Sequence, residues 1–156
     1  MKEKLQEYAL VAEIIGGVAI VASLIFVGIQ INQSNKLAVA SAMDASNART
    51  DSISRLAIEY DIPNINLKLR NNQELSGNER SRLRLFIETR LRHYETTYFQ
   101  FLLDLVDEEQ WDSNYNGLHS LVSSPAFNIV FPNWHEGDGT TQFGSSFVEI
   151  VNEIYE

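Results

Sequence analysis

The sequence feature that most constrains this chain is an uncharged apolar run that follows Glu13. Within residues 14–31 only Ser23 and Gln30 have polar side chains. Eighteen helical residues at 1.5 Å each extend about 27 Å, close to the roughly 30 Å thickness of a bilayer's hydrocarbon core. The run therefore predicts a single membrane-spanning helix, which we place at residues 13–35.

Two other structures produce such a run: a cleaved export signal and the central helix of a globular core. A signal peptide begins with a basic segment free of acids, but here Glu3, Glu7 and Glu13 interrupt that segment. The A-x-A-like candidates in "LAVASAM" also come too far downstream for a cleavage site. A core helix is apolar on every face, but the rest of this chain is too small to bury so long a helix all round. The membrane span is therefore the favoured interpretation.

Small residues recur along one side of the predicted span. Their spacings of four, three and four place them on one stripe of a helix. Small residues let a second backbone approach closely, and in lipid such packing replaces the hydrophobic effect as the associating force. The stripe predicts helix association, although Gly is also simply common in membrane helices. It consists of Ala12, Gly16, Ala19 and Ser23.

Amide side chains gather where the span ends, at Gln30, Gln33 and Asn35. In an oligomer they could ring the mouth of a pore. The alternative is that they mark the interfacial end of the helix and hydrogen-bond to lipid headgroups or to each other. We favour this second interpretation.

The segment after the span predicts a continuation of the same helix. Residues 36–62 are rich in alanine, and no proline occurs before Pro63. A residue that precedes proline is pushed out of helical geometry, so we expect the helix to end near Tyr60. Its apolar side chains are few and small, which suits close packing against a neighbour better than burial in a large core.

The remaining residues predict a small bundle of helices. Ser76 and Glu79 have the S-x-x-E spacing of a capping box and precede an amphipathic pattern that runs to Leu105. Asp107 is a candidate N-cap for the next helix, and Pro125 stands where the first turn of a short helix tolerates proline. No alternating pattern indicates a strand. We predict an all-α fold, in which a long N-terminal transmembrane helix extends into a small helical bundle: a tail (1–12), the span (13–35), a helical extension (36–62) and a soluble domain (63–156).

Charge is distributed unevenly along the chain, whose formal net charge is -9. All 12 Lys and Arg residues lie at or before Arg92, and every charged residue after it is acidic. Such an acidic half repels nucleic-acid phosphates and anionic lipids, which argues against nucleic-acid binding. The basic and acidic segments could pair between subunits. The basic segment is Arg80, Arg82, Arg84, Arg90 and Arg92.

No residue pattern indicates catalysis, and we predict no enzyme activity, no cofactor and no metal. The chain has no cysteine, no G-x-S-x-G and no phosphate-binding glycine loop. His93, with Glu88 and Glu95 nearby, lacks the paired Glu-x-x-His spacing of a helical metal site. The loop "HEGDG" at residues 135–139 has two acids where a calcium loop needs several oxygen ligands, so we interpret it as a surface turn.

Two stretches carry a resemblance to known sequences. The edge of the span, "VGIQINQSNK", and the stretch "LRHYETTYFQF" followed by "LVDEEQW" resemble a set of uncharacterised bacterial membrane proteins. Members of that set have one N-terminal transmembrane helix and a C-terminal α-helical domain, and their span edge usually carries more basic residues than the single Lys36 here. The resemblance implies a single-span anchor with a helical soluble domain, and it implies no activity and no catalytic residue.

Three hypotheses for function follow. The first is a membrane-anchored interaction or scaffold protein that self-associates as a homo-oligomer, or docks to a membrane-protein partner, through its span and helical extension. The second is a subunit of a homo-oligomeric pore. The third is a membrane-tethered enzyme or ligand sensor with a pocket among Tyr94, Tyr98, Trp111 and Trp134. We expect a single-pass protein of the cell inner membrane, with the lipid bilayer as a partner and the soluble domain on the cytoplasmic side.

Overall fold

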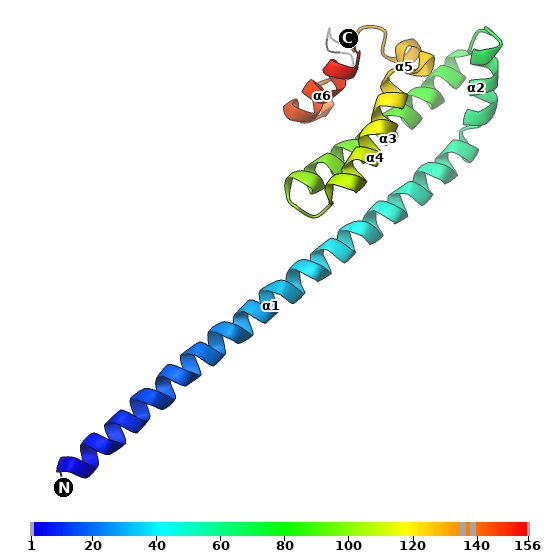
Figure 1. Cartoon of the computed structure of the whole chain (residues 1–156). Helices are drawn as coiled ribbons and strands as arrows, with labels where there is room; N and C mark the ends of the chain where they lie inside the picture. The colour runs from blue at the N-terminus through cyan, green and yellow to red at the C-terminus, as the bar shows by residue number, and fades with distance from the viewer. Residues whose placement is uncertain (1, 135–136, 138–139, 156) are drawn as a thin grey trace. The chain divides into compact units, whose positions relative to one another are not determined.

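The structure, a computed structural model, describes residues 2–134, 137 and 140–155 (Figure 1). The loop "HEGDG" therefore lies outside the described residues except for Gly137. Across the part of the chain that is described there is no strand, so the predicted all-α fold is confirmed. In chain order the elements are α1 (Lys2–Glu59), α2 (Ile62–Arg70), α3 (Gly77–Leu102), α4 (Glu108–Val122), α5 (Pro125–Val130), the 3₁₀ turn η2 (Thr140–Gln142) and α6 (Ser145–Tyr155).

The chain divides into two units within α1, Met1–Ala40 and Ser41–Glu156. The described part of the first unit is a single run of helix. Of the helices that the structure describes, α1 is the one that is long and apolar enough to cross a membrane, by length and composition. The predicted continuation of the helix after the apolar run is confirmed, since α1 reaches Glu59 without interruption.

One residue with unusual backbone geometry separates α1 from α2. Asp61 has φ 57° and ψ 35°, the left-handed conformation that Asp tolerates better than most residues. Its side chain accepts a hydrogen bond of 2.7 Å from Asn64 Nδ2, and Pro63 then occupies the first turn of α2. The helix therefore ends where the sequence "DIP" predicts.

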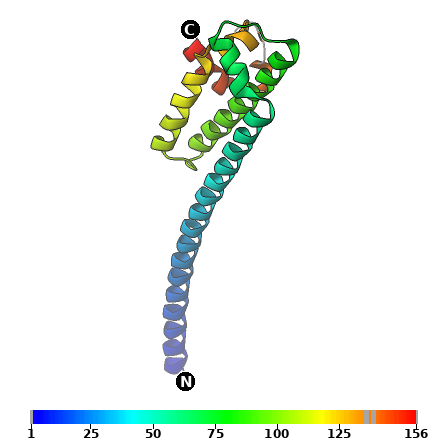
Figure 2. The same ribbon diagram turned by 90° about the vertical axis from the view of Figure 1, so that its right-hand side faces the viewer.

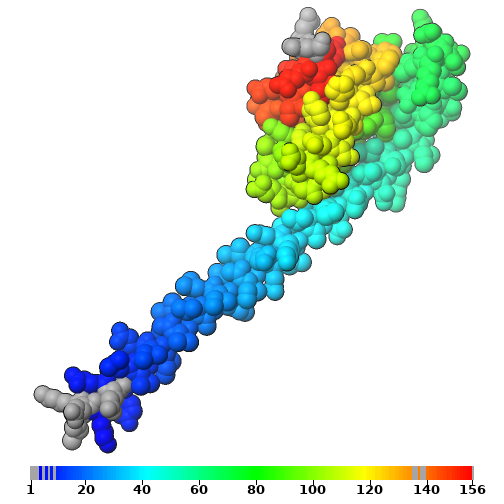
Figure 3. Space-filling model, viewed as in Figure 1, coloured from blue at the N-terminus to red at the C-terminus, as the bar shows by residue number. Residues whose placement is uncertain are grey.

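The second unit is a bundle built around α3 and α4, which run antiparallel and side by side (Figure 2). The short helices α2 and α5 pack against α3, and α6 lies beside α4, where Figure 3 shows the two on one face. Gly117 of α4 allows the close approach to α3, because a Cβ atom at this position would lie 2.7 Å from Tyr94 Oη. A side chain at this point would force the two long helices apart.

The core of the bundle is apolar, and its C-terminal half is aromatic. Trp134 is fully buried, and its indole Nε1 donates a hydrogen bond of 2.9 Å to Asn152 Oδ1 of α6. Neighbouring rings in this group have centroids 5.2 to 6.1 Å apart, the spacing of favourable tilted and edge-on contacts. The other rings of the group are Phe127, Phe131, Phe143 and Phe147.

The predicted helix starts are confirmed by their caps. The Glu79 amide donates to Ser76 Oγ at 3.3 Å, and the Ser76 amide donates to Glu79 Oε2 at 2.9 Å, which completes the capping box. A hydrogen bond from Lys68 of α2, together with those from Ser76, lowers the pKa of Glu79 to about 2. Asp107 accepts from the Gln110 amide at 2.8 Å and so caps α4.

The predicted end of α3 is wrong. The amphipathic pattern that runs to Leu105 places this residue in the helix, but α3 ends at Leu102. Asp104 adopts φ 57°, and the Leu105 amide donates back to the Gln100 carbonyl at 2.9 Å. This pairing is a Schellman motif, which turns the chain out of the helix and usually has glycine in the left-handed position.

Candidate functional site

The predicted association stripe lies on the first unit of α1. Ala12, Gly16, Ala19 and Ser23 are all exposed. A Cβ atom built on Gly16 would meet nothing within 4 Å, so no described residue fills the space beside it. The Ser23 hydroxyl donates to the Ala19 carbonyl at 2.8 Å, which satisfies this polar group within the helix itself.

The amides Gln30, Gln33 and Asn35 also lie exposed on α1. They occupy the last part of the first unit, before the division at Ala40. Their exposure is compatible with contact to headgroups and with the pore mouth, so the choice between these two interpretations stays a prediction.

The second part of α1 belongs to the second unit, where Ala45, Ser46 and Arg49 line a small cavity together with residues of α3. Ala42 is buried, and Ser46, Ile53 and Ala57 are half-buried. Ala57 packs against the edge of the hydrophobic core. Some of the small apolar side chains of the extension are therefore buried within the bundle itself.

His93 of α3 is the titratable group at this contact. It is half-buried, and its Nδ1 atom is buried with no hydrogen-bond partner among the described residues. Burial lowers the pKa of His93 below 6.5, and the positive charges of Arg49 on α1 and Arg90 on α3 lower it further, against a hydrogen bond with Asn114 of α4. The surroundings of His93 therefore favour the neutral imidazole more than water does.

Glu88 and Glu95, the acids nearest to His93 in sequence, are engaged elsewhere. Glu88 accepts from Arg84 Nε at 3.0 Å, and Glu95 accepts from the Gly144 amide at 2.7 Å. Within the described residues no group of three His, Asp or Glu side chains could hold a metal ion.

Three of the five arginines of the predicted basic segment lie over aromatic rings of their own bundle. A guanidinium above a ring is attracted by the ring's negative face. Arg80 is exposed and Arg82 half-exposed, and neither has such a ring contact within the described part of the chain. The distances from the guanidinium carbon to the ring centroid are 5.0 Å for Arg84 and Phe131, 5.6 Å for Arg90 and Tyr94, and 5.1 Å for Arg92 and Phe143.

The aromatic residues of the proposed ligand pocket pack against other rings. Trp134 lies in the core, with 0% of its surface exposed. Trp111 stacks on Phe101 with ring centroids 5.7 Å apart and also contacts Tyr98. Both tryptophans are therefore engaged in ring contacts within the bundle.

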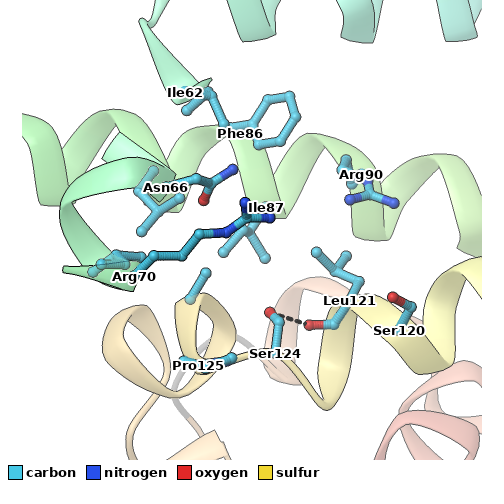
Figure 4. A pocket seen from close by; sticks show the side chains of 13 residues that line it. Ile62, Asn66, Arg70, Phe86, Ile87, Arg90, Ser120, Leu121, Ser124 and Pro125 are labelled. Carbon is cyan, nitrogen blue, oxygen red and sulfur yellow. Dashed lines mark hydrogen bonds between the residues drawn. The ribbon is translucent and has the colours of Figure 1, made fainter. Parts of the chain in front are cut away.

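A cavity that sequence reasoning missed lies between α2, α3, α4 and α5, and its volume is about 410 Å³ (Figure 4). Its apolar floor includes Leu83, Ile87 and Leu121, all buried side chains. The charged residues that line it are Arg70 and Arg90. No acidic residue lines this cavity among those described.

Three polar side chains complete the cavity wall. Asn66 and Ser120 are exposed, and Ser124 is half-buried. Ser124 Oγ donates to the Leu121 carbonyl at 2.6 Å and accepts from the Phe127 amide at 3.3 Å, so it is already engaged. In the sequence, the only sign of this wall is the spacing of four between Asn66 and Arg70, which puts both on one side of α2.

Comparison of the chain with known protein families, curated proteins and solved structures gave no match, so the resemblance to single-span bacterial membrane proteins stays a prediction.

Proposed function

We propose that this protein is a membrane-anchored helical protein that associates with copies of itself, or docks to another membrane protein, through α1. The observation that carries the proposal is the exposure of the apolar run. Ile14, Leu24 and Phe26 are 61, 66 and 60% exposed. Burying one such side chain is favourable by roughly 1.5–3 kcal/mol, so a run of them is stable in the apolar interior of a bilayer and unstable in water.

The glycines of the span support its use as a contact surface. A glycine inside a helix costs about 1 kcal/mol relative to alanine. Gly16 and Gly17 have open space where a Cβ atom would stand, so no contact with the described part of the chain requires glycine at these positions. A second helix packed on the stripe would use this space, because two backbones approach closely where side chains are small.

The test measures association in lipid. The full chain, labelled with a donor or an acceptor fluorophore, is reconstituted into liposomes, and energy transfer is followed as lipid is added and as unlabelled chain competes. The double substitution Gly16→Leu with Ala19→Leu places bulky side chains on the stripe. It should abolish specific energy transfer, which is the part that excess unlabelled chain suppresses. The matched control, Val18→Leu with Val21→Leu, adds bulk to the same turns away from the stripe and should leave that transfer intact.

Two results would contradict the proposal. One is release of the chain from membranes by an alkaline wash, which removes peripheral proteins and leaves spanning ones. The other is equal energy transfer in both double variants, because association would then not depend on the stripe. Ion flux into the same liposomes, lost on Gln30→Leu, would instead favour the pore hypothesis.

A further inference from the structure

We infer that the cavity between α2, α3, α4 and α5 binds a small amphiphilic anion, a molecule with one carboxylate or phosphate group and a short apolar part. This binding site goes beyond the proposed membrane role of α1, since all of its lining residues lie between positions 62 and 126. Two properties of the cavity define the ligand: the charge of its lining side chains and the apolar surface of its floor.

The positive charge of the cavity lacks a counterion among the residues that the structure describes. The Arg70 side chain makes no hydrogen bond or ion pair with any described residue, in a chain where 21 acids outnumber 12 bases. Arg90 donates one hydrogen bond of 2.6 Å, to Tyr94 Oη, and a guanidinium has five N–H donors. Two like charges that line one cavity repel, and an anion bound beside them would relieve the repulsion and accept charge-assisted hydrogen bonds.

The apolar side chains of the cavity wall favour an apolar group on the ligand. Leu83 and Ile87 belong to the core and are each only 1% exposed, and Phe86 and Leu69 are half-buried in the wall. The volume of about 410 Å³ lies within the range of roughly 300–1,000 Å³ that is usual for small-molecule sites. An inorganic ion would leave the solvent-exposed parts of Phe86 and Leu69 in water, whereas an alkyl or aryl group would cover them.

The side chains are arranged so that one ligand can meet both surfaces. Figure 4 shows the Arg70 side chain extending from α2 toward Ile87 of the floor, with Arg90 farther along α3. The Ser120 hydroxyl on α4 makes no hydrogen bond with the described residues, so it is available as a further donor. An acid group beside the guanidinium groups would leave its apolar part over the floor.

The experiment titrates the full chain in lipid nanodiscs by calorimetry, with empty nanodiscs as the blank. The probes are hexanoate and hexyl phosphate, which have both ligand parts, and hexan-1-ol and inorganic phosphate, which have one part each. We expect saturable binding of at least one of the first two, and binding of hexan-1-ol and inorganic phosphate weaker by about tenfold or more, which corresponds to ~1.4 kcal/mol.

Two substitutions tie this binding to the cavity. Arg70→Gln removes one charge from an exposed position and should weaken binding of the anionic probe by about tenfold or more. Ser120→Phe places a phenyl ring in the cavity from α4 and should abolish binding of the anionic probe. The control Arg82→Gln removes the same charge from a residue of α3 outside the cavity and should leave affinity unchanged.

Three outcomes would overturn the inference: no saturable binding of either anionic probe, equal binding of hexan-1-ol and hexanoate, or equal effects of Arg70→Gln and Arg82→Gln. Two further probes distinguish a natural ligand derived from lipid from a soluble one. Tighter binding of dodecanoate than of hexanoate indicates a ligand derived from lipid. Tighter binding of phenylacetate than of hexanoate indicates a soluble aromatic acid.

Discussion

Gly117→Ala tests a close contact between α3 and α4, the two long helices of the bundle. The new Cβ atom would lie 2.7 Å from Tyr94 Oη and 3.3 Å from two ring carbons, where ordinary contacts begin at about 3.4 Å. Tyr94 cannot move aside freely, because it is only 6% exposed and its hydroxyl accepts a hydrogen bond from Arg90. The substitution must therefore displace the ring or separate α3 from α4.

The magnitude follows from two opposing effects. Overpacking of a well-packed core costs about 1–3 kcal/mol. Replacing glycine by alanine inside a helix raises the free energy of unfolding by about 1 kcal/mol, because alanine has the higher helix propensity. We expect a net loss of about 1 kcal/mol in the free energy of unfolding, which lowers the melting temperature by roughly 2–4 °C in a chain of this size.

The assay is scanning calorimetry of the full chain in detergent, with two comparisons. Gly77→Ala is the control, since a Cβ atom there would meet nothing within 4 Å and the substitution should not destabilise. In a Tyr94→Phe background the closest atom is gone, so Gly117→Ala should change from destabilising to neutral or stabilising, which a double-mutant cycle measures as coupling. If Gly117→Ala lowers the melting temperature no more than Gly77→Ala in both backgrounds, the reasoning is refuted.

Two further predictions concern polar groups inside the bundle. The pKa of His93 is lowered in the folded chain, so the unfolded chain binds more protons as the pH falls. The contribution of neutral His93 to the free energy of unfolding is complete above about pH 6.5 and is lost as the pH falls through the folded pKa. Urea unfolding of the full chain from pH 7.5 to pH 5 should show this loss, His93→Gln should reduce the slope, and an unchanged slope would contradict the assignment. Asn152→Ala leaves the buried Trp134 Nε1–H without its acceptor and should cost about 1–3 kcal/mol. The same urea unfolding assay measures this loss of stability. The control is Asn128→Ala at an exposed position of α5, which should change the free energy of unfolding little.

Local signals explain which parts of the fold could be predicted. The starts of α3 and α4 depend on hydrogen bonds between residues three apart, such as that between Asp107 and Gln110, and a short motif reveals them. The uninterrupted α1 follows from the absence of proline before Pro63. The end of α3 could not be predicted, because Asp104 takes a left-handed conformation that glycine usually marks.

The cavity could not be predicted, because its lining combines four helices that are distant in sequence. Periodicity shows that Leu83 and Ile87 face inward, but it does not show which helix they meet. Arg90 belongs to a run that reads as a charged surface, whereas its guanidinium lies beside Tyr94 and in the cavity wall. Arg70 stands at the end of a short helix with no motif around it.

The contacts between arginines and aromatic rings have a consequence for the response to ionic strength. The described residues form three ion pairs, and residues 41–156 have 18 acids against nine bases, so the bundle keeps a repulsive negative charge. Dissolved salt screens that repulsion over about 10 Å at 0.1 M, whereas short contacts such as Arg84 on Phe131 are screened much less. Added salt therefore stabilises this bundle, where it would weaken a bundle held together by surface ion pairs.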